Sequence, residues 1–235
     1  MTGAVALVLA AGEGERLGAG TPKAFVPLGG TTMLALASGA AARCQEVRWL
    51  VVVVPRGWER RAESLLPSPL PLAVVTGGSS RQESVRRALE AVPSEVGSLV
   101  CHDAARPFAS GGLFAAALDA LREADGAVPV LPVPDTVKRL RDGIVVGTVP
   151  REELGLAQTP QAFRAEALRK AHARALADGV EGTDDAALLE RTGFRVVTVP
   201  GEPGNFKVTT SDDLARAEAI LAAGRASGAV EATRG

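Results

Sequence analysis

The fold of this chain is decided near its start by residues 5–18, VALVLAAGEGERLG, where an apolar run leads straight into a glycine-rich segment. A continuous apolar run bounded by glycine is typical of a parallel strand buried on both faces, so we predict a strand from Val5 to Leu9. Glycines directly after a strand let the backbone approach a ligand and present N–H groups to phosphate oxygens. Because ligands of open parallel sheets bind outside the carboxyl ends of the strands, we expect an anion site at residues 10–18.

Two basic side chains strengthen this interpretation, because Arg16 can form a fork on phosphate oxygens and Lys23 supplies a compact positive charge. The pattern lacks the Gly-Lys-Ser/Thr end of a Walker A motif, since Lys23 lies well downstream of the glycines. It also departs from the dinucleotide-binding G-x-G-x-x-G, since Leu17 stands where the third glycine belongs, and we set a dehydrogenase aside. A tight turn with an exposed arginine is the structural alternative. The spacing of the two cations favours a triphosphate cradle.

Beyond this segment, apolar runs alternate with amphipathic stretches, which predicts an α/β fold with a mostly parallel, twisted sheet and helices on both faces. The strands are expected at residues 5–9, 49–54, 72–75, 99–102, 127–131 and 195–199. The helices are expected at residues 33–42, 58–65, 81–91, 112–124, 165–177, 184–191 and 212–222. Ser80 and Glu83 form a capping-box pattern, and Thr183 and Ser211 are predicted N-caps.

One stretch interrupts the alternation, because residues 136–140 and 144–149 flank Asp142-Gly143, a strong hairpin turn signal. A hairpin inserted into a parallel-sheet protein needs a surface to pack on. We predict that it projects as an arm, about residues 134–158, and pairs with a second subunit in a homodimer. An edge hairpin on the same chain is the alternative. We expect one domain over residues 1–223 and a flexible tail over residues 224–235.

The composition excludes several other functions. The formal net charge of -1 provides no global field to attract nucleic acid or an anionic membrane, and no apolar run approaches the roughly 20 residues of a membrane span. Aromatic residues make up only 3% of the chain and tyrosine is absent, so base stacking cannot be the main recognition device. Cys44 and Cys101 have neither metal-site spacing nor a disulfide framework, and they fit buried thiols in a reducing cytoplasm.

A second element of the expected site is Asp103, which directly follows the predicted strand at residues 99–102 and therefore lies at the ligand-facing end of the sheet. A carboxylate beside a triphosphate is a natural Mg²⁺ ligand, because magnesium is often held by one or two carboxylates together with phosphate oxygens. Capping of the next turn is the alternative. Arg106, three residues on, can pair with a phosphate or with Asp103. We interpret His102 as a structural residue and His172 as a surface residue.

These residues carry a resemblance to a known family. The pattern LVLAAGxGxRLG at residues 7–18, followed by Pro22-Lys23, resembles the signature of the nucleotidyltransferases with a GT-A-like, Rossmann-like fold. Four further segments in order resemble the cytidylyltransferases of 2-C-methyl-D-erythritol 4-phosphate: GGSSRQESV at 77–85, HDAARP at 102–107, PDTVK at 134–138 and NFKVT at 205–209. The resemblance covers about residues 3 to 222.

The resemblance implies a set of site residues. The expected nucleotide-binding residues are Ala10, Ala11, Gly12, Gly14, Gly78, Ser79, Ser84 and Ala104. The expected catalytic cations are Arg16, Lys23 and Lys207. The expected acceptor-binding residues are Asp103, Arg106, Thr136, Arg151, Thr159 and Thr183, with Asp103 also holding Mg²⁺ or another divalent cation. The family often carries an acid where Ser79 stands, so we expect the backbone of Gly78 to contact the cytosine.

The four residues Thr136, Arg151, Thr159 and Thr183 would be interpreted as solvated surface from their types alone. The resemblance implies that they shape the acceptor pocket. It also implies that Arg151 and Thr136 reach the pocket of the partner subunit through the arm.

The implied reaction is the transfer of CMP from CTP to 2-C-methyl-D-erythritol 4-phosphate, which releases pyrophosphate and forms 4-diphosphocytidyl-2-C-methyl-D-erythritol, an isoprenoid precursor. A phosphate monoester is already mostly dianionic at neutral pH, so this nucleophile needs no general base. Catalysis would then consist of positioning and charge stabilisation. Two alternatives stay open: a cytidylyltransferase of ribitol 5-phosphate or a related polyol phosphate, and a non-catalytic nucleotide-sensing module. The joint presence of Lys23, Asp103 and Lys207 favours an enzyme.

Overall fold

The computed structural model describes residues 3–12, 20–66 and 69–232, with side chains described as far as residue 224. Residues 13–18 of the predicted cradle lie outside the described residues, and with them two of the expected site residues, Gly14 and Arg16. The remaining members of the expected site all lie within them.

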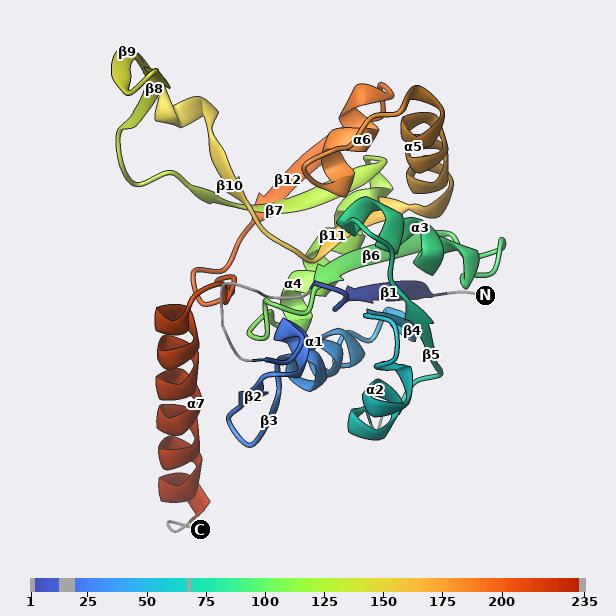
Figure 1. Cartoon of the computed structure of the whole chain (residues 1–235), viewed down its shortest axis with the longest axis vertical. Coiled ribbons are helices and arrows are strands. Elements are labelled where there is room, and N and C mark those ends of the chain that lie inside the picture. The colour runs from blue at the N-terminus through green and yellow to red at the C-terminus, as the bar shows by residue number, and fades with distance from the viewer. Residues whose placement is uncertain (1–2, 13–19, 67–68, 233–235) are drawn as a thin grey trace.

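The body of the molecule is a twisted sheet with eight strands among the described residues (Figure 1). Its strands are β1 (Ala4–Leu9), β4 (Val47–Val54), β5 (Leu72–Thr76), β6 (Ser98–Asp103), β7 (Gly126–Pro132), β10 (Gly155–Ala157), β11 (Gln161–Arg164) and β12 (Val196–Pro200). The order is β10-β7-β11-β6-β1-β4-β5, and β12 pairs with β7. All six predicted strands are present, so the α/β prediction is confirmed.

The sheet is mixed, although its centre is parallel as predicted. β6, β1, β4 and β5 run parallel to one another, and β12 runs parallel to β7. The two strands that the sequence did not predict, β10 and β11, are antiparallel to their neighbours. β11 has four residues, too few to show a hydrophobic period, and β10 has three exposed residues. Their strand conformation therefore comes from pairing in the folded chain.

Helices cover both faces of the sheet because residues of each central strand alternate between them. Val5 and Leu7 of β1 pack with the helices α3, α5 and α6, whereas Ala6 and Val8 face α1, α2 and α4. The helices are α1 (Met33–Ala42), α2 (Glu59–Leu65), α3 (Arg81–Glu90), α4 (Gly111–Asp119), α5 (Ala165–Asp178), α6 (Asp185–Arg191) and α7 (Ser211–Ala232). Short elements are η2 (Lys23–Phe25), β2 (Pro27–Leu28), β3 (Thr31–Thr32), η3 (Ala120–Arg122) and η4 (Arg151–Glu153).

The helix caps partly follow the prediction. Ser80 caps α3 by accepting a hydrogen bond from the N–H of Glu83, as predicted. The cap of α6 is Asp184, whose carboxylate accepts from the N–H of Ala187, and the prediction of Thr183 was wrong by one residue. The prediction of Ser211 as the cap of α7 was also wrong by one residue, because the Thr210 hydroxyl accepts from the N–H of Asp213. In both cases adjacent residues could cap, and backbone direction decides between them.

The predicted hairpin is present as β8 (Val137–Arg141) and β9 (Ile144–Val149). Its turn residues Asp142 and Gly143 have φ angles of 48° and 78°, the left-handed values that a tight two-residue hairpin turn requires. The hairpin forms a sheet of its own and stands away from the body of the domain (Figure 1). We call residues 134–158 the arm, as predicted.

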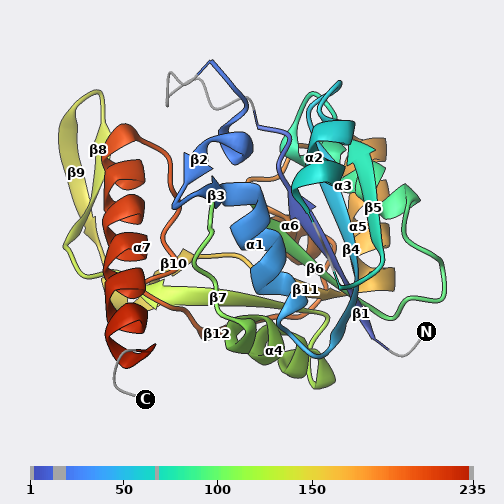
Figure 2. The same cartoon turned by 90° about the horizontal axis from the view of Figure 1, so that it is seen from below.

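The arm and α7 both lie at the end of the domain opposite α2, α3 and α5 (Figures 1 and 2). α7 continues to Ala232, ten residues beyond the predicted helix, and its Leu214, Ala217 and Leu221 pack in one cluster with Leu28 of β2 and Met33 of α1. The division into a domain at 1–223 and a tail at 224–235 stays a prediction. Within the described part of the chain, each helix is too short or too polar to cross a bilayer.

Candidate active site

A cavity of about 690 Å³ opens at the carboxyl ends of β1 and β6, where the sequence predicted an anion site. Five separate segments line it: the loop after β1, the start of η2, the loop before α3 with the first turn of α3, the end of β6 with the residues after it, and the loop that carries Lys207. The lining residues are Leu9, Ala10, Ala11, Gly12, Lys23, Ala24, Gly78, Ser79, Ser80, Arg81, Ser84, Asp103, Ala104, Ala105 and Lys207. The fold therefore brings together all of the predicted nucleotide-binding and catalytic residues that the structure describes.

Parallel pairing places the first loop beside Asp103. The N–H of Ala10 donates to the carbonyl of Val53 at 2.7 Å, and the N–H of Ala104 donates to the carbonyl of Leu9 at 3.0 Å. These bonds extend the sheet by one residue past the end of each strand. The loop that starts at Ala11 and the carboxylate of Asp103 consequently lie at the same edge of the sheet.

The loop before α3 is held by its own side chains. The N–H of Gly78 donates to the Ser84 hydroxyl at 3.0 Å, and Ser79 donates to the Glu83 carboxylate through both its N–H and its hydroxyl. In a strict capping box the Glu83 carboxylate would accept from the N–H of the N-cap residue, Ser80. Here it accepts from the N–H of Ser79, one residue earlier. A Cβ atom on Gly77 would lie 2.3 Å from the Cβ of Ala11, so glycine is required for the two loops to meet.

Asp103 is the only carboxylate that lines this cavity among the described residues, and two cations hold it. Arg81 Nε lies 3.2 Å from Oδ1, and Lys207 Nζ lies 2.7 Å from Oδ2. Burial alone would raise the pKa of Asp103, but the charges of Arg81 and Lys207 outweigh burial and hold that pKa well below its ordinary value. Asp103 is therefore ionised at neutral pH.

Thr159 and His102 support Asp103 from below. The Thr159 hydroxyl accepts from the N–H of Asp103 at 3.0 Å and lies 3.1 Å from Nδ1 of His102. His102 Nε2 lies 3.1 Å from the carbonyl of Arg106, which can only accept, so Nε2 carries the proton and Nδ1 accepts from Thr159. Burial lowers the pKa of His102 to about 4, so the ring is neutral at pH 7. The structural interpretation of His102 is confirmed, and the expectation from residue type of a solvated Thr159 was wrong.

Arg106 holds the loop that carries Lys207. Its Nη1 donates to the carbonyl of Asn205 at 2.8 Å and its Nη2 to the carbonyl of Ala157 at 3.2 Å. Among the described residues its side-chain hydrogen bonds go to these carbonyls and not to Asp103. The buried Gln158 side chain also donates to the carbonyl of Asn205, which fixes the same loop a second time. Arg106 and Gln158 thereby join the base of the arm to the loop of Lys207.

Three functional side chains escaped the sequence prediction. Arg81 lines the cavity and pairs with both Asp103 and Asp185, and Asp185 in turn contacts His172. His172 is only 1% exposed, so its interpretation as a surface residue was wrong. Helix α5 turns it toward α6 and away from solvent. The available signal was the position of Arg81, one residue after an N-cap at the ligand-facing edge of the sheet.

Of the six expected acceptor residues, only Asp103 lines the cavity; Arg106 and Thr159 contact the backbone of Asp103, and the other three lie elsewhere. Thr136 and Arg151 are exposed on the arm, where Arg151 Nη1 donates to the carbonyl of Pro134 at 2.6 Å. Thr183 is exposed just before α6. Within one subunit, the structure therefore does not bring these three together with Lys23 and Asp103.

A cavity at the carboxyl edge of a parallel sheet, lined by a glycine-containing loop, two lysines and one ionised carboxylate, is the arrangement expected of a nucleotidyltransferase. Residues 4–223 match the family model described as IspD: 2-C-methyl-D-erythritol 4-phosphate cytidylyltransferase. The chain belongs to this family, and it is a cytidylyltransferase of the non-mevalonate pathway.

Individual relatives agree with this assignment. A 2-C-methyl-D-erythritol 4-phosphate cytidylyltransferase from Rhodococcus jostii is 48% identical over 222 residues, covering 94% of this chain and 96% of the relative. The crystal structure of that enzyme from Thermus thermophilus is 40% identical with a TM-score of 0.78, covering 94% of this chain and 99% of the other. The structure of 4-diphosphocytidyl-2C-methyl-D-erythritolsynthase from Anaerococcus prevotii has a TM-score of 0.84 at 29% identity, covering 93% and 98%.

Proposed function

We propose that the cavity binds CTP and that the phosphate of 2-C-methyl-D-erythritol 4-phosphate attacks the α-phosphorus there, with pyrophosphate as leaving group. The observation that carries this proposal is the convergence of Lys23, Lys207 and Asp103 on one cavity from three distant parts of the chain. Each would be unremarkable on a surface. Together they provide positive charge around a pocket large enough for a nucleotide, which is what transfer of a phosphoryl-linked group requires.

The two lysines act by charge and position. Lys23 lies at the start of η2, facing the loop after β1, where a triphosphate would receive backbone N–H groups. Lys207 lies on the opposite side, beside Asp103, and its side chain is 44% exposed. We assign Lys23 to the β- and γ-phosphates and Lys207 to the α-phosphate or the acceptor phosphate. Arg16 would complete the set on the triphosphate, as its motif position implies.

The cytosine is assigned to the loop before α3. Ser84 and Glu83 already occupy the N–H groups of Gly78 and Ser79, so the loop is rigid before any ligand enters. Its remaining backbone groups can therefore read a base edge without first being ordered, which lowers the entropic cost of binding. The Ser79 hydroxyl is engaged by Glu83, which supports base contact through backbone atoms.

Asp103 is the residue that would hold Mg²⁺ or another divalent cation. Among the described residues no group of three or more His, Cys, Asp or Glu could hold a metal, and Asp103 is the one carboxylate that they contribute to the cavity. Magnesium accepts this, because phosphate oxygens and water fill its other positions. Each Asp103 oxygen has one hydrogen bond from a cation and retains lone pairs for a metal. When bound, the ion would neutralise charge on the phosphate oxygens.

The arm is assigned to subunit contact. Six of its large apolar side chains are exposed, and four of these lie in the hairpin: Leu140, Ile144, Val145 and Val146 at 61%, 67%, 57% and 48%. An exposed apolar hairpin with its own two-stranded sheet is only marginally stable, and a second subunit would cover it. Dimerisation would also carry Thr136 and Arg151, which lie outside the cavity of their own subunit, to the cavity of the partner subunit. A cytoplasmic location is supported by Cys44 and Cys101, both buried and free.

The test is turnover with two substrates. Pyrophosphate release is measured with CTP, ATP, GTP or UTP, each combined with 2-C-methyl-D-erythritol 4-phosphate or with ribitol 5-phosphate. We expect release for CTP with the methylerythritol phosphate alone. Faster turnover with ribitol 5-phosphate would show that this polyol phosphate is the acceptor instead. Calorimetric binding of CTP without release for any polyol phosphate would instead indicate a nucleotide sensor and overturn the catalytic proposal.

A further inference from the structure

A continuous series of polar contacts leads from the interior of the α5–α6 layer to the cavity. His172 Nε2 on α5 lies 2.9 Å from Asp185 Oδ1 at the start of α6. The other oxygen of Asp185 accepts from Arg81 Nη1 at 2.8 Å, and Arg81 Nε donates to Asp103 Oδ1 at 3.2 Å. Four residues from four different elements are thus joined by direct contacts, and only the last two line the cavity.

The inner end of this series is sealed from water. The side chains of His172 and Asp185 are 2% and 1% exposed, whereas that of Arg81 is 30% exposed. Burial alone would raise the pKa of Asp185, but Arg81 and His172 outweigh it and hold that pKa below its ordinary value. A buried ionised carboxylate is costly unless it is fully paired, so its presence needs an explanation. An apolar contact between α5 and α6 would pack these helices equally well.

We infer that Asp185, oriented by His172, is a positioning residue that fixes Arg81 and through Arg81 aims the carboxylate of Asp103 into the cavity. The guanidinium of Arg81 is planar, and its Nε and Nη1 donate to two different carboxylates, Asp103 and Asp185. Without Asp185, both nitrogens could turn onto Asp103, in the bidentate geometry that arginine and carboxylate prefer. Asp103 would then be withdrawn from its ligand. The inference rests on the proposed role of Asp103 toward CTP and the divalent cation.

The two cations on Asp103 have different tasks in this arrangement. Lys207 has only Asp103 as an ion-pair partner among the described residues, so an arriving phosphate can draw it away. Arg81 cannot follow, because Asp185 holds it from the buried side. Asp103 thus keeps one fixed hydrogen-bond donor while its other oxygen becomes available. Removal of a residue that orients a metal ligand without binding the metal itself usually lowers metal affinity or activity by about 10- to 100-fold.

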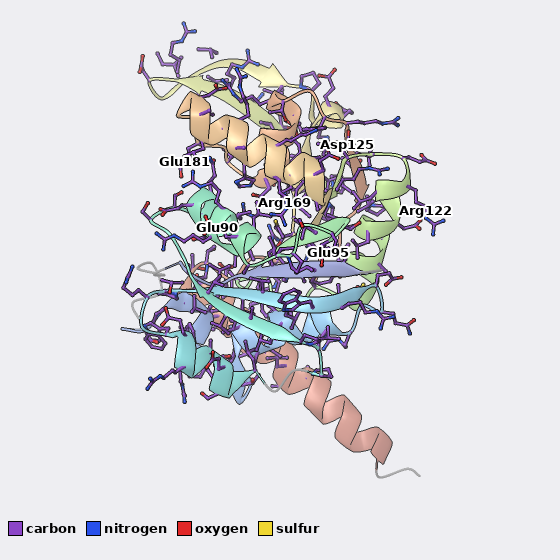
Figure 3. The ribbon with its side chains drawn as sticks, turned by 90° about the vertical axis from the view of Figure 1, so that its right-hand side faces the viewer. Glu90, Glu95, Arg122, Asp125, Arg169 and Glu181 are labelled. Atoms are coloured by element: carbon purple, nitrogen blue, oxygen red, sulfur yellow. The ribbon has the colours of Figure 1, made fainter. Side chains whose placement is uncertain are left out.

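The test compares four variants with the parent enzyme. Asp185→Asn keeps the size of the side chain and removes its charge, and Arg81→Ala removes the fork. His172→Leu removes the donor to Asp185, whereas His172→Gln retains an N–H donor as a conservative rescue. The matched control is Arg169→Gln. Arg169 also lies on α5 (Figure 3), but it donates to the carbonyls of Leu89 and Val92 at the end of α3 and does not line the cavity. Urea unfolding reports how much stability each substitution removes.

Two measurements separate positioning from stability. The first is kcat together with the Mg²⁺ concentration that gives half-maximal rate, and the second is calorimetric binding of CTP in the presence of Mg²⁺ without acceptor. For Asp185→Asn and His172→Leu we expect kcat to fall about 10-fold or more, and the half-maximal Mg²⁺ concentration and the CTP dissociation constant to rise about 10-fold. His172→Gln should bring kcat, the half-maximal Mg²⁺ concentration and the CTP dissociation constant back to within about three-fold of the parent values. Arg169→Gln should lower the free energy of unfolding and leave these three quantities unchanged.

A double variant shows whether Asp185 acts through Arg81. In the Arg81→Ala background, Asp185→Asn should cause no further loss, because the residue through which it acts is already gone. Additive losses, or an Asp185→Asn enzyme that matches the Arg169→Gln control in both measurements, would overturn the inference. If Asp185→Asn does not fold, the contrast between His172→Leu and His172→Gln decides. A parent enzyme that releases no pyrophosphate would refute the proposed function instead, and CTP calorimetry would still test the positioning.

Discussion

Lys207 Nζ lies 2.7 Å from Oδ2 of Asp103, although 104 residues separate the two in the chain. The contact joins the loop after β12 to the end of β6 at the mouth of the cavity. It has two consequences: the charge of Lys207 helps to keep Asp103 ionised, and the contact holds the long Lys207 side chain where we propose that the α-phosphate binds. The free enzyme therefore already has this charge in place before CTP binds.

The lysines of the cavity should control turnover. We expect Lys23→Ala and Lys207→Ala each to lower kcat by about 100-fold, since loss of one charge that stabilises a transition state costs on the order of 3 kcal/mol. Lys170→Ala is the control, because Lys170 is exposed on α5 and pairs only with Glu166 among the described residues. A Lys23→Ala enzyme with kcat within a few-fold of the parent would show that the cradle has another role.

Thr159 should matter through Asp103. Thr159→Val leaves the N–H of Asp103 buried without its acceptor, which typically costs about 1–3 kcal/mol, and we expect a drop of that size in the free energy of unfolding in urea. kcat should fall as well, because the carboxylate shifts with its backbone. Thr159→Ser keeps the hydroxyl and should retain both. A Thr159→Val enzyme that loses only affinity for the acceptor, with unchanged stability, would support direct substrate contact instead.

His102 should make the protein less stable in mild acid. Its pKa is about 4 in the folded protein and 6.5 ordinarily, so the unfolded chain binds the proton more readily. The stabilisation is complete above pH 6.5 and is lost as the pH falls toward 4, by about 3 kcal/mol in all. Unfolding free energies at pH 7 and pH 4.5 should therefore differ less in His102→Gln than in the parent. Equal pH dependence in the two proteins would exclude this contribution.

Gly77 should be essential for the contact between the two cavity loops that we assign to CTP, the loop after β1 and the loop before α3. Its substitution by alanine places a Cβ atom 2.3 Å from that of Ala11, so the loops must separate. We expect Gly77→Ala to raise the KM for CTP at least about ten-fold, since misplacement by about 1 Å can cost more than that. Gly97→Ala is the matched control, because its Cβ atom would meet open space. Similar KM values for both variants would contradict this prediction.

The proposed exchange of arms can be tested by mixing inactive subunits. If Arg151 serves the cavity of the partner subunit, an Arg151→Ala subunit and a Lys207→Ala subunit each form inactive homodimers. A mixed dimer would contain one cavity with both residues intact, and a statistical mixture should regain about one quarter of the parent activity when subunits recombine freely. Ile144→Asp on the exposed arm should shift sedimentation toward the monomer. No recovery on mixing would indicate that Arg151 acts within its own subunit, and an Arg151→Ala homodimer with parent activity would show that Arg151 has no role in turnover.

The sequence alone determined the α/β class, the six main strands, the hairpin arm and most of the cavity. These features are local: a buried parallel strand is a continuous apolar run, and a tight hairpin needs Asp142-Gly143. Ligand position followed because the carboxyl ends of parallel strands share one edge, so Ala10 and Asp103 had to meet. The glycines, Lys23 and Lys207 could be recognised from their motifs.

The tertiary structure alone decided which charges pair. β10 and β11 are too short to show a hydrophobic period in the sequence. They are strands only because they pair with β7 and β6 in the folded chain. The burial of His172 and the pairing of Asp185 with Arg81 depend on how α5 and α6 pack over α3, a contact between residues up to 104 positions apart. Sequence patterns report the face of each helix, whereas the pairing of charges requires the distances between helices, which only packing sets.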